Sequence, residues 1–184
     1  MYRALDIFFS ALGLIFFFPI SALIFAIIAF ERLHPIYYQE RLGQYGKPFV
    51  LIKFRTMLKD TVALPTHLVP AHSITTFGGF LRKTKLDELP QLWNVLKGEM
   101  SLVGPRPCLP SQVDLIKARK KLDVFSVRPG ITGLAQIKGI DMSQPELLAK
   151  TDAEMLVGFS IIQYFKYIFL TLLGKGSGDQ IRGR

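Results

Sequence analysis

The stretch IFFSALGLIFFFPISALIFAIIAF runs from Ile7 to Phe30 and decides the fold, because it is strongly apolar and holds no charged residue. In a helix, with a rise of about 1.5 Å per residue, it is long enough to cross the hydrocarbon core of a bilayer. Pro19 near its middle removes one backbone hydrogen bond and clashes with the preceding turn. The stretch therefore predicts a kinked helix in a membrane.

The kinked helix has two possible paths: it either spans the bilayer or dips in and returns to the same side. A return would bring Arg3 and the Glu31–Arg32 pair to one face, with both polar ends near the headgroups. A cleaved signal peptide is disfavoured, because the apolar run exceeds the usual length of roughly 7 to 15 residues and no small-x-small cleavage site follows it. The pattern alone is compatible with both membrane paths.

The composition points to anionic partners. The chain has 184 residues and a formal charge of +9, with 23 Lys and Arg against 14 Asp and Glu, which suits lipid headgroups, phosphorylated ligands or nucleic acid. Nucleic acid is disfavoured, because cations and aromatic side chains do not alternate on a recognition motif.

The single cysteine, Cys108, cannot form an internal disulfide, which indicates a reducing, cytoplasm-facing domain. His34, His67 and His72 lack metal-ligand spacing, so neither zinc nor haem is expected.

The rest of the chain predicts a mainly helical, compact α+β domain. Strands at 36–41 and 49–57 flank turn residues and predict a β-hairpin. A mobile loop is expected at 61–73, a type II turn at 128–130 and a loose tail after Gly174. Helices are expected at 75–83, 88–96, 111–122, 145–157 and 159–173. The helix at 111–122 is expected to be exposed and basic, and the aromatic helix at 159–173 fits either the membrane interface or the core. We expect a membrane segment, 1–33, and one cytoplasmic domain, 34–184.

Two adjacent carboxylates, Asp87 and Glu88, follow a run of cations at 82–85 and precede a helix that tolerates Pro90 in its first turn. Near a helix N-terminus, free N–H groups and the helix dipole favour an ionised carboxylate and an incoming phosphate. A carboxylate attacks phosphorus when cations neutralise the phosphoryl group, so Asp87 is a candidate nucleophile and Glu88 a candidate ligand for Mg²⁺. Aspartate is also a favoured N-cap, so a purely structural role of Asp87 is equally open at this point.

Two arginines lie in conformationally restricted segments. Arg106, within Gly104-Pro-Arg-Pro107, presents its guanidinium from a stiff backbone, which lowers the entropy lost when it binds a phosphate bidentately. Arg128 precedes Pro129-Gly130 and is a second candidate of this kind; a rigid linker and an ordinary surface turn are the plainer interpretations. The sequence has no Walker A loop, Gly-x-Gly-x-x-Gly, Gly-x-Ser-x-Gly or Cys-x-x-Cys motif, so several common enzyme classes lose their main support.

Five motifs in a fixed order, together with the proline-broken apolar helix, carry a resemblance to a known family. They are Lys53-Phe-Arg-Thr-Met57, Leu86-Asp-Glu-Leu-Pro-Gln91, Asn94-Val-Leu-Lys-Gly98, Ser101-Leu-Val-Gly-Pro-Arg-Pro107 and Val127-Arg-Pro-Gly-Ile-Thr-Gly133. With them the chain resembles the monotopic phosphoglycosyl transferases, the bacterial sugar transferase family, over nearly its whole length and in the form of the minimal catalytic core.

The resemblance implies a re-entrant membrane helix hairpin, bent at Phe18–Pro19, with both ends facing the cytoplasm. It implies that Asp87 attacks the sugar-linked phosphate of a UDP-sugar, releases UMP and passes the sugar phosphate to undecaprenyl phosphate. Glu88 is then the ligand of Mg²⁺, and the implied contacts to substrate come from Arg82, Arg106, Arg128, Lys53 and Arg55. The expected location is the bacterial inner membrane with the catalytic domain on its cytoplasmic face, where the reaction is the first membrane step of glycoconjugate assembly.

Two positions depart from the pattern of this family. Its members usually have Ser before the central proline, whereas this chain has Phe18, so the hydroxyl that satisfies a freed carbonyl is missing. Members also often carry an Asp followed closely by paired tyrosines. Asp152 matches the acid, but Ala153, Glu154 and Met155 replace its usual neighbours, so a functional role of Asp152 is open.

Two other functions compete with the transferase. A membrane-bound phosphohydrolase would use the same aspartate and let water resolve the aspartyl-phosphate. A non-catalytic anchor protein would bind anionic lipid through its basic face. Release of UMP that depends on a lipid acceptor distinguishes the transferase from both.

Overall fold

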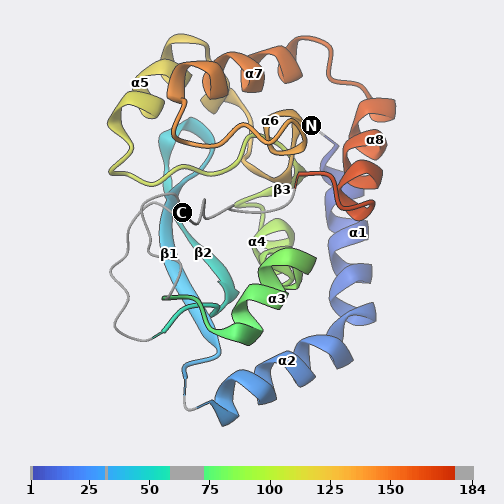
Figure 1. Ribbon diagram of the computed structural model, residues 1–184. Coiled ribbons are helices and arrows are strands. Elements are labelled where there is room, and N and C mark those ends of the chain that lie inside the picture. Colours follow the sequence, from blue (N-terminus) through green and yellow to red (C-terminus); the bar gives the residue numbers. More distant parts are fainter. Residues whose placement is uncertain (1, 32, 59–72, 177–184) are drawn as a thin grey trace.

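The computed structural model describes residues 2–31, 33–58 and 73–176. Figure 1 shows the hairpin of β1 and β2 on one side and α1 with α8 on the other, with α3 and α4 between them. The elements are α1 (Arg3–Phe16), α2 (Phe18–Phe30), β1 (Ile36–Leu42), η1 (Gln44–Gly46), β2 (Pro48–Phe54), α3 (Thr76–Thr84), η4 (Leu86–Glu88), α4 (Gln91–Lys97), β3 (Ser101–Val103), α5 (Val113–Lys121), η5 (Val124–Ser126), β4 (Gly130–Thr132), α6 (Leu134–Ile137), α7 (Pro145–Val157) and α8 (Ile161–Leu172). The predicted mainly helical α+β class is confirmed.

The apolar N-terminal stretch forms two helices, α1 and α2, which are bent by 59° at Phe17. No single helix in the described part of the chain is long and apolar enough to cross a membrane, whereas this bent pair together has the required length and composition. Pro19 lies in the first turn of α2, where its missing N–H needs no partner. The predicted kink is therefore confirmed, and large apolar side chains are exposed along both helices, among them Phe8, Ile15, Phe16, Phe18, Leu23 and Phe30.

Polar contacts fix α1 to the rest of the molecule. The guanidinium of Arg3 donates from Nη1 to the Val95 carbonyl at 2.6 Å and from Nη2 to the Leu96 carbonyl at 2.9 Å, so it neutralises the C-terminal end of α4. Buried Asp6 accepts hydrogen bonds from the Ser101 hydroxyl at 2.9 Å and the Tyr164 hydroxyl at 2.9 Å. Arg3 thus joins the start of α1 to the end of α4.

The β-hairpin was predicted and is confirmed. β1 and β2 pair antiparallel from Ile36 opposite Phe54 to Leu42 opposite Pro48, and β2 ends three residues earlier than expected. The chain reverses through η1, where Tyr45 has φ 58 and Gly46 has φ 71, in the left-handed region. The hairpin places its last strand beside α4 and η4, which follow later in the sequence.

A second sheet, which was not predicted from the sequence, pairs β3 parallel to β4. The backbones of Gly104 and Gly130 meet so closely that a Cβ on Gly130 would lie 2.0 Å from the Gly104 nitrogen. The predicted type II turn at 128–130 is wrong, because such a turn needs a positive φ at its third residue and Gly130 instead begins β4 with a negative one. This glycine is needed for close backbone approach.

The helices match the predictions with shifts at their ends. Residues 145–157 form α7 as expected, while α3 and α5 lie within one or two residues of the predicted bounds. α4 begins at Gln91 instead of 88, because residues 86–88 form the separate turn η4. α5 was expected to be exposed, but its Arg119 is only 2% exposed, so that expectation is wrong on one face. α8 buries Tyr164 and exposes Phe169, so it contributes to the core and also presents an apolar face.

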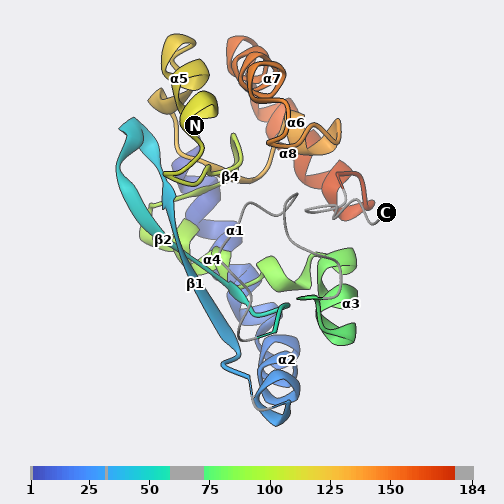
Figure 2. The same cartoon turned by 60° about the vertical axis from the view of Figure 1, so that its left-hand side comes forward.

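Figure 2 shows α5 and α7 at one end of the molecule and α2 at the other. The apolar core is divided accordingly: one cluster holds α5 to α7 around Leu115 and Leu148, and another joins α2 to α3 through Ile28 and Leu81. The predicted loop at 61–73 lies outside the described residues except for Ser73, and the predicted tail lies outside them beyond Gly176.

Candidate functional site

The two adjacent carboxylates lie in the turn η4, between α3 and α4. Asp87 is 7% exposed and Glu88 is 9% exposed, although neither belongs to an apolar cluster. Lys85 ends α3 in the left-handed region with φ 59, and its carbonyl accepts a hydrogen bond from the Glu88 N–H at 3.1 Å. A non-glycine residue in this conformation is uncommon, and such strain concentrates at functional sites. The chain thus turns sharply to bury two acids side by side.

Helix capping does not explain Asp87. The N-cap of α4 is Pro90, three residues further on, and no side-chain hydrogen bond caps that helix. Aspartate as the N-cap of this helix was the structural alternative from the sequence, and the structure excludes it. The burial of Asp87 therefore needs another reason.

The environment of Asp87 disfavours its charge. Burial, and after it the neighbouring Glu88 carboxylate, raise the pKa of Asp87 to about 7. The charges of Lys53, Arg82 and Arg106 oppose this rise and lower the pKa. Close to neutral pH the carboxyl group therefore changes between its protonated and its nucleophilic ionised form.

Arg106 reaches the acidic pair from the segment after β3. Its Nη2 lies 3.0 Å from Oε1 of Glu88, and both side chains are largely buried, with 23% and 10% of their surface exposed. The backbone contact between Gly104 and Gly130 brings this segment into place. Arg106 thus neutralises part of the negative charge of Glu88. Its positive charge also lowers the pKa of Asp87.

Arg82 comes from α3 and is held beside the end of β2. Its Nε donates to the Thr56 hydroxyl at 2.8 Å, while its Nη1 is buried and has no hydrogen-bond partner among the described residues. Gly78 allows this approach, because a Cβ there would lie 2.2 Å from the Thr56 carbonyl oxygen. A buried guanidinium nitrogen without a partner is costly, which fits a group that receives a ligand oxygen.

Lys53 and Arg55 both contact the ring of Tyr37 across the hairpin. The Nζ of Lys53 is 5.5 Å from the ring centroid and the Cζ of Arg55 is 5.4 Å from it. Arg55 also donates from Nε to the His34 carbonyl at 2.9 Å. Of these two cations, Lys53 acts on the pKa of Asp87, whereas Arg55 is directed toward the start of the hairpin.

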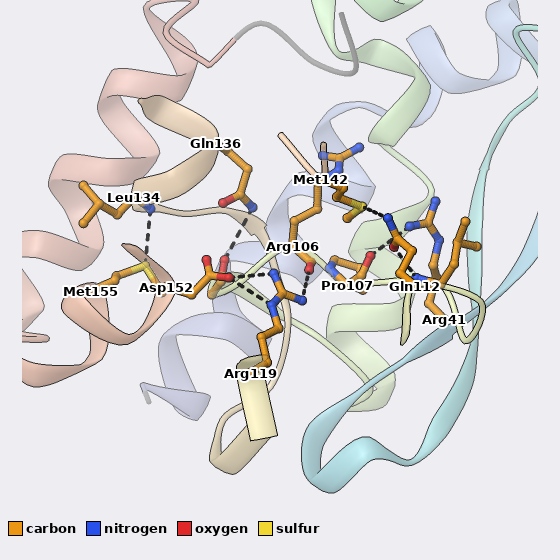
Figure 3. Close-up of polar contacts among 12 residues, drawn as sticks. Arg41, Arg106, Pro107, Gln112, Arg119, Leu134, Gln136, Met142, Asp152 and Met155 are labelled. Atoms are coloured by element: carbon orange, nitrogen blue, oxygen red, sulfur yellow. Dashed lines mark hydrogen bonds and ion pairs between the residues drawn. The ribbon is translucent and has the colours of Figure 1, made fainter. Parts of the chain in front are cut away.

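The remaining predicted residues lie in other contacts. Arg128 donates from Nε to the Gly98 carbonyl at 2.8 Å, at the C-terminal end of α4. Asp152 is 1% exposed and accepts two hydrogen bonds on Oδ2 from Arg119, at 3.0 Å from Nε and 2.6 Å from Nη2 (Figure 3). Arg119 was not among the residues predicted from the sequence, although its spacing of four residues from Leu115 places both on one helix face.

The acidic pair offers a suitable donor set for one divalent cation. No group of three or more His, Cys, Asp and Glu side chains occurs within the described residues, so a fully protein-coordinated metal site is not found there. Mg²⁺ is commonly held by one or two carboxylates, with water and substrate phosphates as its other ligands. Glu88, with Asp87 beside it, would fit this arrangement, since a cation held there would offset the repulsion between the two carboxylates.

Comparisons with known proteins agree with these motifs. The bacterial sugar transferase family matches residues 1–175. The uncharacterized sugar transferase EpsL of Bacillus subtilis (strain 168) is 39% identical over 156 residues, which cover 83% of this chain and 77% of the relative. The undecaprenyl-phosphate glucose phosphotransferase of Komagataeibacter xylinus is 35% identical over 187 residues, covering 92% of this chain.

The UDP-galactose-lipid carrier transferase of Erwinia amylovora is 35% identical over 158 residues, covering 75% of this chain. This chain spans about a third of that relative and of the Komagataeibacter relative, 32% and 35% of their lengths, and most of EpsL. The chain therefore belongs to the bacterial sugar transferase family and is an enzyme that transfers sugar phosphates.

Proposed function

We propose that this enzyme moves a sugar 1-phosphate from a UDP-sugar to undecaprenyl phosphate, and that Asp87 carries the sugar phosphate as a covalent intermediate. The observation that carries the proposal is the buried Asp87–Glu88 pair, which is surrounded by cations from β2, α3 and the segment after β3. The names of two relatives support the substrate classes, since one is a UDP-galactose-lipid carrier transferase and the other an undecaprenyl-phosphate glucose phosphotransferase.

In the first step an ionised Asp87 oxygen attacks the phosphorus that bears the sugar. The bond from this phosphorus to the bridging oxygen breaks, and UMP leaves with the electron pair. Lys53, Arg82 and Arg106 face this position and neutralise the phosphoryl oxygens, which lowers their repulsion of the anionic nucleophile. The same cations lower the pKa of Asp87, so they also favour the ionised form that attacks.

Glu88 is the residue we assign to Mg²⁺. When bound, the ion would supply further charge neutralisation at the diphosphate. Arg106 holds one oxygen of Glu88 through its contact at 3.0 Å and so fixes the direction in which the carboxylate presents its other oxygen.

In the second step an oxygen of undecaprenyl phosphate attacks the phosphorus of the phosphosugar-aspartyl enzyme. The bond between phosphorus and the Asp87 oxygen breaks, and the carboxylate is regenerated. The products are UMP from the first step and a polyprenyl diphosphate sugar from the second, so each bond formed in one step is matched by one broken.

The bent helix pair supports a location at the membrane. α1 and α2 expose large apolar side chains, and a bend of 59° suits a helix that enters one leaflet and returns. We infer a re-entrant segment with the catalytic domain on the cytoplasmic face of the bacterial inner membrane. α8, which lies beside α1 (Figure 1), also exposes apolar side chains, those of Ile162, Phe169 and Leu172.

A mass measurement tests the covalent step. The detergent-extracted protein is incubated with UDP-sugars and Mg²⁺ without lipid acceptor, digested and analysed. The peptide that contains Asp87 is expected to gain the mass of one phosphosugar, with about one UMP released per enzyme, and Asp87→Asn is expected to show neither. Addition of undecaprenyl phosphate should then remove the adduct and start continuous UMP release.

Other outcomes would contradict the proposal in different ways. Continuous UMP release without lipid, together with free sugar phosphate, would identify a phosphohydrolase. Adduct on a different residue would contradict the role of Asp87 alone. No adduct and no UMP from any donor, with the protein folded and in lipid, would favour an anchor without catalytic activity.

Labelling of single cysteines tests the membrane path. Cys108 is buried, so it gives little background. The exposed positions for Ala4→Cys, in the first turn of α1, and Glu31→Cys, just after α2, mark the two ends of the bent pair. An impermeant maleimide should label both from the cytoplasmic side in inverted vesicles and neither in intact cells. Labelling of the two positions from opposite sides would establish a spanning helix instead.

A further inference from the structure

The segment Pro105–Pro107, here called the strap, carries Arg106 from the end of β3 to Glu88. Its two prolines have no N–H group, so the strap cannot be fixed by the ladder of backbone donors that holds an ordinary strand. The position of the Arg106 side chain therefore depends on what binds the strap carbonyls.

Each strap carbonyl accepts a hydrogen bond from a different element. The Pro105 carbonyl accepts from the Gly130 N–H at 2.9 Å. The next two carbonyls accept from arginine side chains: Arg119 Nη1 donates to the Arg106 carbonyl at 2.8 Å and Arg41 Nη1 donates to the Pro107 carbonyl at 2.9 Å. The strap is thus held at three successive residues from β4, α5 and β1.

The two arginines use their guanidinium nitrogens in the same way, and Figure 3 shows Arg119 and Arg41 on either side of Arg106 and Pro107. Arg119 uses Nε and Nη2 to bind one oxygen of Asp152 and has Nη1 left for the strap. Arg41 uses Nε and Nη2 to bind the side-chain oxygen of Gln39, at 3.1 and 2.7 Å, and has Nη1 left for the strap. In both cases a planar guanidinium spans an acceptor and a strap carbonyl, which the point-like ammonium of lysine cannot do.

Stability alone is a poor reason for the Arg119–Asp152 pair. Both side chains are almost fully buried, at 2% and 1% exposure, next to the apolar cluster that contains Leu115 and Leu148. Apolar residues of similar volume in place of a buried ion pair are often as stable or more stable. What apolar residues cannot supply is a donor for the Arg106 carbonyl.

We propose that Arg119, Asp152 and Arg41 are positioning residues, which act through the strap to hold the Arg106 guanidinium against Glu88. This rests on the proposed function, in which Arg106 neutralises the phosphoryl group. Asp152 thereby obtains a role that its contacts support: it holds Arg119, which holds the strap. Positioning by such supporting groups matters because a shift of about 1 Å in a charged group can cost roughly 100-fold in rate.

A double-mutant cycle with Arg106 tests the proposal. Arg119→Lys keeps the charge but loses the planar fork, and its kcat/KM is expected to fall about 10-fold, which corresponds to about 1.4 kcal/mol. In the Arg106→Ala background the same change is expected to cost less than about 2-fold, because the side chain that the strap positions is gone. Leu115→Val, on the same face of α5, is the matched core control. It is expected to lower kcat/KM by the same small factor in both backgrounds.

An equal loss for Arg119→Lys in both backgrounds would show a general structural role and overturn the inference. Arg41→Lys relaxes the strap from the hairpin side and is expected to show the same dependence on Arg106, so it decides the matter if Arg119→Lys does not fold. Transfer by the unmodified enzyme is measured first. If that is absent with every donor and acceptor, the proposed function fails; if it is present and the losses are independent, only this inference fails.

Discussion

Asp87 and Asp152 are both buried carboxylates, yet their surroundings differ in kind. Asp152 faces one buried guanidinium, which approaches it with two nitrogens at 3.0 and 2.6 Å. Asp87 is followed in the chain by a second acid, and the cations around it come from three separate elements. Burial alone therefore does not distinguish an acid that reacts with substrate from one that holds another side chain, whereas the balance of charge around it does.

The pKa values express this difference. Burial raises the pKa of both groups, but Arg119 opposes the rise at Asp152, whereas Glu88 adds to it at Asp87 and brings it to about 7. The folded chain thus holds Asp87 in a place that disfavours its ionised form. A site that is unfavourable by itself and becomes favourable with a cation or phosphate nearby is typical of catalytic groups.

Asp87→Asn should give the largest effect on activity. The amide has nearly the same size but cannot form the acyl phosphate with the phosphosugar, so kcat/KM is expected to fall by at least about 1000-fold. Radiolabelled sugar transfer to undecaprenyl phosphate measures it. Glu154→Gln, on the exposed face of α7, is the control and should retain full activity. Substantial turnover by the asparagine variant would remove Asp87 from the chemistry.

Asp152→Asn should give the largest effect on stability. It leaves the Arg119 charge buried against a neutral amide, and the loss in free energy of unfolding is expected to be about 3 kcal/mol. Thermal unfolding in detergent measures it. Glu154→Gln again serves as control, because it breaks an ion pair to Lys138 whose side chains are 45% and 64% exposed, and about 0.5 kcal/mol or less is expected. Equal shifts in the two variants would mean that burial of the Asp152 pair has no energetic consequence.

Local sequence patterns predicted much of the fold but not its long-range pairing. The hairpin and α7 follow from alternation, turn residues and helical period, which act within a few residues of each other. β3 and β4 are three residues each and pair across almost thirty positions of sequence. Their contact depends on close approach of Gly104 and Gly130, which local propensity does not encode.

The candidate site shows the same limit. The motifs predicted Asp87, Glu88 and their cations, and the structure gathers Lys53, Arg82 and Arg106 around the pair. Their chemical roles stay predictions. Arg119 was taken for part of an exposed helix, because a charged residue is expected at the surface unless its partner is known. That partner, Asp152, lies 33 positions further along the chain.

Glu88→Gln removes the like charge from beside Asp87, which is the main difference between the surroundings of Asp87 and Asp152. The amide is a poorer ligand for a divalent cation, so the Mg²⁺ concentration for half-maximal transfer is expected to rise roughly 30-fold. Titration of Mg²⁺ into EDTA-treated enzyme measures it. A matched titration of Glu154→Gln should give the unmodified value, because Glu154 lies in an exposed ion pair with Lys138, away from the strap and from Glu88. An unchanged Mg²⁺ requirement in Glu88→Gln would move the metal away from Glu88.

The stability of Asp87→Asn is expected to change with a sign opposite to that of Asp152→Asn. Because the folded pKa of Asp87 is raised to about 7 from an ordinary value of 3.8, the native protein loses stability as pH rises between these values, while the asparagine variant does not. The variant is expected to match the native protein below about pH 4, to gain on it up to pH 7 and to hold a constant advantage above that. Thermal unfolding from pH 4 to 8, without Mg²⁺ or substrate, measures the difference. An advantage that is largest at low pH would mean that cations, and not the buried neighbouring acid, dominate the environment of Asp87.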